Sequence, residues 1–286
     1  CTRHPCSTGN NPTLYSCTHC KTHMNNKNWV LITGGAHRLG REIALAFAKA
    51  GWSVLCHYRT SKDSAQKTRQ EVQDAGADCL LVDMDLAQDN AAELLMDQCV
   101  QLTGQPPQCI VNNASIFEAD DAPSATAEGL QRHFQVNTVT PLLLANALYN
   151  RVRQGSGVAH GTHCVIHVLD QKVHNLNPDY FSYTVSKLAL ERSVALQAQA
   201  LAPTVRVCGL SPGLMYLSGP QTQTNFDKAS LVNLVQKRID PADVAQGALF
   251  MAQNPSINGC TLRTDNGQHL IPLSRDVMWA IEEAAH

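Results

Sequence analysis

The stretch Trp29-Val-Leu-Ile-Thr33-Gly34-Gly35-Ala36-His37-Arg38-Leu39-Gly40 decides the fold. Its first part, 29–34, is a short apolar run that ends in glycine, which predicts a buried β-strand. The residues that follow, 41–51, carry apolar side chains at helical spacing and end at Gly51, a residue type that often closes a helix. A strand, a glycine-rich turn and a helix in this order predict the start of an α/β fold.

The alternation of strand and helix continues through the rest of the chain. Further strands are predicted at 53–59, 78–85, 108–114, 162–170, 205–212 and 260–267. Further helices are predicted at 61–76, 89–103, 126–150, 180–202 and 241–252, with Pro141 as the one expected kink and with 214–239 irregular apart from one helix at most. Crossovers of this length predict a Rossmann-type, doubly wound parallel sheet with helices on both faces. No linker or repeat interrupts the pattern, so residues 29–286 are predicted to form one domain.

Composition excludes several classes of protein. The 286 residues include 22 Lys and Arg against 24 Asp and Glu, a net charge of −2, which argues against a polybasic nucleic-acid or membrane-surface protein. Hydrophobic residues make up 44% of the chain, enough for a sizeable core, so global disorder is excluded. Because no run of roughly 18 apolar residues occurs, no transmembrane helix is expected. We therefore expect no nucleic-acid partner and no membrane partner.

Eleven cysteines fall into two groups, four in the segment 1–28 and seven in the rest of the chain. The segment contains a C-x-x-C pair with further candidate zinc ligands nearby: Cys17, Cys20, Cys6, His4, His19 and His23. No second pair with suitable spacing follows, so we predict no metal site and a disordered leader over 1–28. Several of the other seven lie inside apolar runs, and we expect all seven to be reduced core residues of a cytoplasmic protein.

The glycine-rich turn also predicts a binding site. Glycines at a strand-to-helix junction let backbone N–H groups approach a pyrophosphate, and the helix N-terminus favours its negative charge. The second strand ends in His57-Tyr58-Arg59-Thr60-Ser61, where a protein that binds NAD would carry an acidic residue for the ribose 2′-hydroxyl. Arg59 with two hydroxyl groups suits a 2′-phosphate instead, and Arg38 adds a second positive charge. We therefore expect NADP(H), although a solvated charge at the strand end would also explain Arg59.

Five motifs in the right order resemble the short-chain dehydrogenase/reductase family over about residues 28–270. They are the glycine turn, similar to T-G-x-x-x-G-x-G; Asn112-Asn113-Ala114, similar to N-N-A-G; Asn137; Tyr183-Thr-Val-Ser-Lys187, a Y-x-x-x-K; and Ser211-Pro212-Gly213. The resemblance implies that Asn137, Tyr183 and Lys187 are catalytic. It implies these cofactor-binding residues: Gly34, Arg38, Leu39, Gly40, His57, Tyr58, Arg59, Thr60, Ser61, Asp85, Leu86, Asn113, Ala114, Ser115, Tyr183, Lys187, Pro212 and Gly213. It also implies a homotetramer, packed partly through the helices 126–150 and 180–202.

The spacing of Tyr183 and Lys187 fits a catalytic role. Residues four apart lie on one face of a helix, so both side chains can point into one cleft. An ammonium group near a phenol favours the phenolate and is expected to lower the pKa of Tyr183. The tyrosine would then exchange a proton near neutral pH.

Two departures from the family pattern point to one branch of it. Arg38 replaces the middle glycine of the turn, and Asp170 stands thirteen residues before Tyr183, where the family carries a catalytic serine. A carboxylate cannot imitate a neutral hydroxyl that hydrogen-bonds to a ketone oxygen, but it suits a substrate with N–H donors. Both departures, together with the run 112–117 (NNASIF), resemble the pteridine reductase branch, which includes bacterial dihydromonapterin reductases.

The resemblance to this branch implies a set of substrate-binding residues: Arg38, Ser115, Phe117, Asp170 and Tyr183. Phe117 would stack the flat pterin against the nicotinamide. Three of these residues also have a plainer interpretation. Phe117 could pack under its own loop, Asp170 could cap the next turn, and Ser115 could cap the loop that carries it.

Three functions remain open from the sequence. We favour the NADPH-dependent reduction of a dihydropterin, such as dihydromonapterin, dihydrobiopterin or dihydrofolate, with Tyr183 and Asp170 handling the proton. A short-chain reductase of ketones or acyl-thioesters is the second, and Asp170 argues against it. A non-catalytic NADP(H)-binding sensor is the third, and the intact pair of Tyr183 and Lys187 argues against it.

Overall fold

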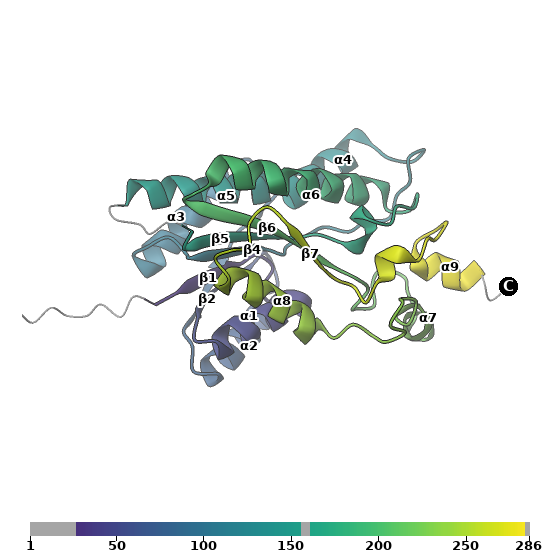
Figure 1. Ribbon diagram of the computed structural model, residues 1–286, viewed down its shortest axis with the longest axis horizontal. Helices are drawn as coiled ribbons and strands as arrows, with labels where there is room; N and C mark the ends of the chain where they lie inside the picture. Colours follow the sequence, from purple (N-terminus) through teal and green to yellow (C-terminus); the bar gives the residue numbers. More distant parts are fainter. Residues whose placement is uncertain (1–26, 156–160, 284–286) are drawn as a thin grey trace, which may run out of the picture.

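A seven-stranded sheet forms the centre of the computed structural model, which describes residues 27–155 and 161–283 (Figure 1). Its strands are β1 (Trp29–Ile32), β2 (Ser53–Tyr58), β3 (Cys79–Asp83), β4 (Cys109–Asn112), β5 (His163–Val168), β6 (Val205–Pro212) and β7 (Thr261–Thr264). All neighbours pair in parallel, in the order β3-β2-β1-β4-β5-β6-β7. The predicted Rossmann-type sheet is confirmed, and its order reverses between β1 and β4, the place where ligands bind in such sheets.

Helices cover both faces of the sheet, as predicted. They are α1 (Arg38–Lys49), α2 (Lys62–Asp74), α3 (Ala91–Thr103), α4 (Ala127–Phe134), α5 (Thr140–Gln154), α6 (Phe181–Leu201), α7 (Gln223–Ala229), α8 (Pro241–Gln253) and α9 (Val277–Glu283). Figure 1 shows α3, α5 and α6 on one face and α1, α2 and α8 on the other. The irregular segment 214–239 contains one helix, α7, as expected, whereas α9 was not predicted.

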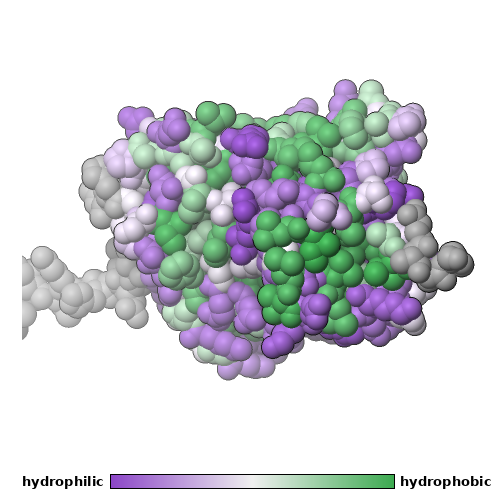
Figure 2. All heavy atoms as spheres, turned by 45° about the vertical axis from the view of Figure 1, so that its right-hand side comes forward, coloured by the Kyte–Doolittle hydropathy of each residue, from purple (hydrophilic) through white to green (hydrophobic). Residues whose placement is uncertain are grey.

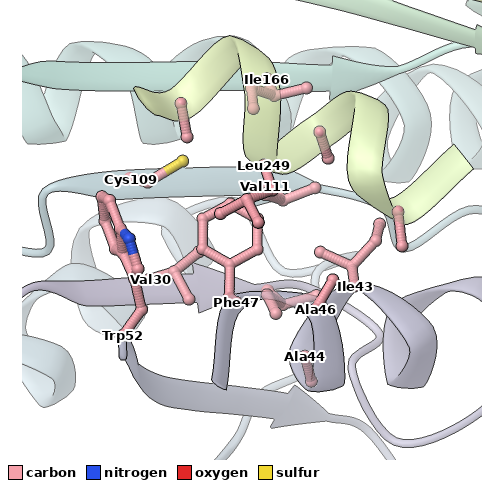
Figure 3. Close-up of a cluster of buried hydrophobic side chains, with 14 of the residues drawn as sticks. Val30, Ile43, Ala44, Ala46, Phe47, Trp52, Cys109, Val111, Ile166 and Leu249 are labelled. Carbon is pink, nitrogen blue, oxygen red and sulfur yellow. The ribbon is translucent and has the colours of Figure 1, made fainter. Parts of the chain in front are cut away.

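The sheet is held by two apolar cores, one on each face. Successive side chains of a strand point to opposite faces, so Val30 and Ile32 pack toward α1 and α8 while Trp29 and Leu31 pack toward α3 and α5. Figure 3 shows the first core, where the ring of Phe47 on α1 lies beside Val30 and Val111. Because both faces are covered, the strands read as continuous apolar runs rather than as alternating ones.

The predicted helix 126–150 is wrong in its continuity. The chain instead forms α4, a π-helical turn over Gln135–Val139, and then α5 with Pro141 in its first turn. Proline has no N–H to donate to the carbonyl four residues back, and the turn before it widens so that the Thr140 N–H bonds the Gln135 carbonyl. The widened turn carries Asn137, which is fully buried.

The cysteine predictions hold for six of the seven residues that the structure describes. Cys56, Cys79, Cys99, Cys109, Cys164 and Cys208 are free and buried. Cys260 is free but exposed, because it immediately precedes β7 at the edge of the sheet, so its assignment to the core is wrong. The expected leader, with its cysteines and histidines, lies outside the described residues except for Lys27 and Asn28.

Two further features concern the described ranges, 27–155 and 161–283. No helix within them is long and apolar enough to cross a membrane. Within the same ranges, no group of three His, Cys, Asp or Glu side chains is arranged to hold a metal ion.

Apolar side chains are exposed in two regions. Leu143 and Leu196 are exposed on α5 and α6, the helices through which the tetramer is expected to pack. Leu231, Leu234 and Leu270 are exposed near α7 and α9, and Figure 2 shows extensive apolar surface when that side of the molecule is turned forward. These surfaces are compatible with the homotetramer, which stays a prediction.

The glycine-rich turn brings two backbone segments together more closely than any side chain allows. A Cβ atom on Gly40, in the first turn of α1, would lie 2.1 Å from the carbonyl oxygen of Gly34 and 2.8 Å from Asn113 Nδ2. Both contacts are far inside van der Waals distance, and one is with backbone that has little room to move. Glycine at position 40 is therefore a steric requirement of the junction between β1 and α1.

We predict that Gly40→Ala lowers the free energy of unfolding by about 1–3 kcal/mol, because the added methyl group overpacks this junction. Urea denaturation would measure the change. Gly129→Ala in α4 is the control, since its Cβ would meet only the Thr126 hydroxyl at 3.2 Å and alanine favours a helix. Equal stability of Gly40→Ala and wild type would contradict the steric requirement.

Candidate active site

A cleft of about 480 Å³ is lined at the carboxyl ends of the strands by nearly all the predicted site residues. Every residue predicted to bind the cofactor or the substrate lines it, from the glycine turn at one side to Phe117 and Asp170 at the other. Asn137 is the one predicted site residue that does not. Residues dispersed over the sequence from Gly34 to Gly213 thus share one cavity.

The loop after β4 locks the glycine turn in place. Thr33 Oγ1 accepts the backbone N–H groups of Asn113 and Ala114, at 2.9 Å and 3.0 Å. Asn113 Nδ2 in turn donates to the carbonyl oxygens of Thr33 at 3.0 Å and Gly34 at 3.2 Å. The N-N-A motif therefore acts first as a brace, which holds the turn at the switch point of the sheet.

His57 supports the same turn as a neutral side chain. Its Nδ1 accepts the Gly34 N–H at 3.0 Å, and its Nε2 lies 3.0 Å from the Met84 carbonyl, which fits a ring protonated at Nε2. Burial lowers the pKa of His57 to about 4. His57 therefore adds no positive charge beside Arg38 and Arg59 at neutral pH; it lines the cleft and fixes the glycine turn.

Two arginines supply the positive charge of this part of the cleft. Arg59 is exposed at the end of β2 and forms no ion pair with a described residue. Arg38 has a φ of 51°, in the left-handed region that favours glycine, which explains why the family carries glycine at this position. Its guanidinium donates to the Leu217 carbonyl at 2.8 Å and lies 5.0 Å from the centre of the Tyr216 ring. Arg38 thus joins the glycine turn to the loop after β6.

Asp170, Tyr183 and Lys187 meet at the end of β5. Tyr183 Oη donates to Asp170 Oδ2 at 2.8 Å, and Lys187 Nζ donates to the Val168 carbonyl at 2.7 Å. The other carboxylate oxygen, Oδ1, accepts the Lys172 N–H at 2.8 Å, so Asp170 also caps the following turn. Asp170 therefore caps the turn, as its plainer interpretation held, while its other oxygen contacts the Tyr183 hydroxyl.

The proton affinities of the three groups differ from the expectation. Burial, with the neighbouring Asp170 carboxylate, raises the pKa of Tyr183 well above its usual value. Burial lowers the pKa of Lys187 to about 8 and raises the pKa of Asp170. The prediction that Lys187 lowers the pKa of Tyr183 is wrong for this arrangement, because the closest charged group to the phenol is a carboxylate.

Asn137 supports the loop after β4, which carries Ser115 and Phe117. Its Oδ1 accepts from the Ile116 N–H at 2.9 Å and from Ser115 Oγ at 3.1 Å. Its Nδ2 donates to the Ile116 carbonyl at 3.0 Å and to Ser186 Oγ at 3.1 Å. These bonds tie the loop after β4 to α6, and Ser115 caps its loop through them, as its plainer interpretation held.

Phe117, in the loop after β4, packs against two aromatic residues at the start of α6, Tyr180 and Tyr183. Its ring stacks on Tyr180, with the centroids 4.0 Å apart and the planes at 19°. It meets Tyr183 edge to face at 4.7 Å and 88°. Because Phe117 also lines the cleft, it is packed against its neighbours and still offers an aromatic wall.

Asp120 fixes the start of α6, and sequence reasoning missed it. Its Oδ1 accepts the Ser182 N–H at 3.0 Å, its Oδ2 accepts from the Ser182 hydroxyl, and its carbonyl accepts the Phe181 N–H at 3.3 Å. The residue before the helix, Tyr180, has a φ of 57° and caps nothing with its side chain. A cap that lies 62 residues away in sequence gives no local signal.

Lys172 and Asp276 were also missed, although both line the cleft. Their side chains form a salt bridge of 3.0 Å across 104 residues. A lysine four residues after the end of β5 is interpreted as a surface charge in a single sequence, and the C-terminal segment carries no motif. Only the fold brings the two together.

Comparison with known proteins shows which family this chain resembles. A family model described as enoyl-(acyl carrier protein) reductase, of the short-chain dehydrogenase/reductase type, matches residues 34–269. The dihydromonapterin reductase of Enterobacter sp. (strain 638) is 27% identical over 244 residues, which cover 84% of this chain and 96% of that protein.

Solved structures with the same fold include two enzymes from Brucella. The FolM alternative dihydrofolate reductase 1 of Brucella canis, complexed with NADP, is 31% identical with a TM-score of 0.76, and covers 85% of this chain and 95% of its own. That of Brucella suis, also with NADP, is 32% identical with a TM-score of 0.75, covering 85% and 96%. The chain belongs to the short-chain dehydrogenase/reductase family, in its pteridine reductase-like branch.

Proposed function

We propose that this protein reduces a dihydropterin to the tetrahydro form with NADPH. The observation that carries the proposal is the 2.8 Å hydrogen bond from Tyr183 to Asp170 at the end of β5. A carboxyl group beside the tyrosine serves a substrate that has N–H donors and takes up its proton on nitrogen, whereas a ketone needs a neutral hydroxyl there. The names of the similar Enterobacter and Brucella proteins support the same class of substrate.

The residues around the glycine turn fit NADPH. A Cβ on Gly34 would lie 3.1 Å from Ala114 Cα, so the turn presents bare backbone to the cleft. The first turn of α1 has no acidic residue and no side-chain cap, which suits a pyrophosphate. Arg59, with Thr60 and Ser61 beside it, would hold the 2′-phosphate. When bound, NADPH supplies the hydride.

The chain itself supplies the proton. Because burial and the Asp170 carboxylate raise the pKa of Tyr183, the phenol stays protonated and keeps its hydrogen in the bond to Asp170. Asp170 accepts the hydrogen bond from that O–H. Because burial raises its own pKa, Asp170 can take up a proton from solvent and pass it to the substrate nitrogen. Lys187 holds the carbonyl of Val168, two residues before Asp170, and so keeps the carboxyl group in reach of the phenol.

The aromatic wall fits a flat ring system. Phe117 lines the cleft together with Asp170 and Tyr183, and Tyr180 supports its ring from behind by stacking. Stacking of aromatic planes is worth about 0.5–1.5 kcal/mol beyond the area buried. A planar pterin would gain this contact, whereas an aliphatic thioester would not.

Reduction of an acyl-thioester is the second candidate, because the matching family model bears the description of an enoyl-(acyl carrier protein) reductase. A parallel assay separates the candidates: NADPH oxidation is followed with dihydromonapterin, dihydrobiopterin, dihydrofolate and an acetoacetyl thioester. Turnover of a dihydropterin supports the proposal. Turnover of the thioester alone refutes it, and tight NADPH binding with no turnover would favour a sensor.

We predict that Asp170→Ser lowers kcat for the dihydropterin by about tenfold or more, the usual scale of general acid–base help. Steady-state kinetics would measure the loss. Asp78→Ser is the control, because Asp78 is half exposed before β3, at the opposite end of the sheet from the cleft. Unchanged turnover in Asp170→Ser would remove the carboxyl group from the mechanism.

A second prediction concerns the cofactor. Arg59→Glu should raise the Kd of NADPH at least about tenfold more than that of NADH, since an acidic side chain repels a 2′-phosphate and accepts from a 2′-hydroxyl. Quenching of protein fluorescence would measure both constants. Arg69→Glu makes the same charge change at an exposed position of α2 that does not line the cleft. Equal weakening of both cofactors by Arg59→Glu would mean that Arg59 does not touch the 2′-phosphate.

Stability and activity should move in opposite directions at Asp170. Its pKa is raised in the folded protein, so ionisation costs folding free energy above the unfolded-state pKa of about 3.9 and costs none below it. We predict that Asp170→Asn increases the free energy of unfolding by about 0.5–2 kcal/mol at pH 7 while turnover falls. Denaturation at pH 7 and at pH 3 would show the gain only at pH 7. A gain of equal size at both pH values would mean that ionisation is not its source.

A further inference from the structure

A buried salt bridge lies beside the catalytic residues and takes no part in the chemistry described above. Lys172 is 2% exposed, and its Nζ donates to Asp276 Oδ2 at 3.0 Å and to Asn177 Oδ1 at 2.7 Å. The side chain of Asp276 is 16% exposed. A buried ammonium group is tolerated only when it is paired, so Asp276 is what allows a lysine at this position.

The salt bridge fastens the C-terminal segment to the loop that carries Asp170. Asp276 directly precedes α9, and its Oδ1 accepts the Met278 N–H at 3.2 Å. Beside it, Asp179 accepts the Asp276 N–H at 2.7 Å and the Arg275 guanidinium at 2.9 Å. One partner of the salt bridge thus belongs to the loop after β5 and the other to the last helix.

The fastened segment forms part of the cleft. Asp276 and Val277 line it together with Asp170. One residue further on, Met278 packs into the cluster of Tyr180 and Tyr183, with Phe117 against it. The segment therefore closes the cleft beside the residues proposed to bind the substrate, away from the glycine turn at the other side.

We propose that Lys172 is a positioning residue for the substrate, which acts by holding the segment 276–278 as a wall of the cleft. This rests on the proposed function in one respect, that the substrate lies between Phe117 and Asp170. Without the ammonium group, Asp276 would carry an unpaired charge in a partly buried place, and the segment would leave the cleft to solvate it. The substrate would then lose a wall, while the cofactor site would keep its own.

The test compares Lys172→Met with wild type in two measurements. Amide hydrogen exchange should become at least about tenfold faster over residues 277–283, since the helix is no longer fastened. The KM for the dihydropterin should rise about tenfold or more, with kcat and the Kd of NADPH changed by less than about twofold. Lys27→Met is the control, because it removes an exposed pair, with Asp78, at the opposite end of the sheet.

A double variant keeps the test valid if Lys172→Met is unstable. Lys172→Met with Asp276→Asn removes both charges and keeps a side-chain oxygen that can accept the Met278 N–H. It should restore slow exchange and bring KM back toward the wild-type value. If KM stays high while exchange is slow, Asp276 itself binds the substrate and the positioning role of Lys172 is refuted.

Other outcomes also decide the matter. Unchanged amide exchange in Lys172→Met would refute the claim that Lys172 holds the segment 276–278 in place. Faster exchange with an unchanged KM would refute the claim that this segment forms a wall of the substrate site. If wild-type protein reduces no dihydropterin, the proposed function fails by itself. The exchange comparison, with KM for whichever substrate is reduced, then still tests Lys172.

Discussion

The close approach of β1 and α1 at the glycine turn is the constraint on which the site depends. Gly40 lies so near the Gly34 carbonyl that no side chain fits, and Asn113 donates to that same carbonyl. Thr33 completes the brace by accepting two N–H groups from the loop after β4. The hydrogen bonds that fix the turn thereby also fix the loop of Ser115 and Phe117, so the two halves of the cleft are set by one junction.

Asp170 connects this scaffold to the chemistry. One carboxylate oxygen caps the turn after β5, and the other accepts a hydrogen bond from the Tyr183 hydroxyl. A serine at this position has one oxygen and could not serve both partners in the same way. The replacement of serine by aspartate therefore has a structural consequence, and it places a group of raised pKa where the proposed proton transfer takes place.

The sequence was sufficient for the sheet, for most helices and for the residues that gather around the cleft. Apolar runs, glycines and the spacing of Tyr183 and Lys187 are local signals, and local signals predict local structure well. The predictions that were wrong or missing concern properties that are set by residues far away in the sequence. The ring of His57 is neutral because it is buried between Gly34 and Met84, and the phenol of Tyr183 responds to Asp170 rather than to Lys187. Lys172 and its salt-bridge partner Asp276 are 104 residues apart, and the sequence around neither residue carries a pattern that predicts the pair.

The π-helical turn over Gln135–Val139 limits how this protein can vary in length. Such a turn is equivalent to one residue inserted into an α-helix, and each residue of an α-helix rotates the chain by about 100°. Deleting a single residue there would restore a regular helix but rotate α4 relative to α5 by that angle. Asn137 would then point away from Ile116 and Ser186. A one-residue gap in this stretch of a related sequence would therefore signal a differently built loop after β4, even where the tyrosine and lysine are retained.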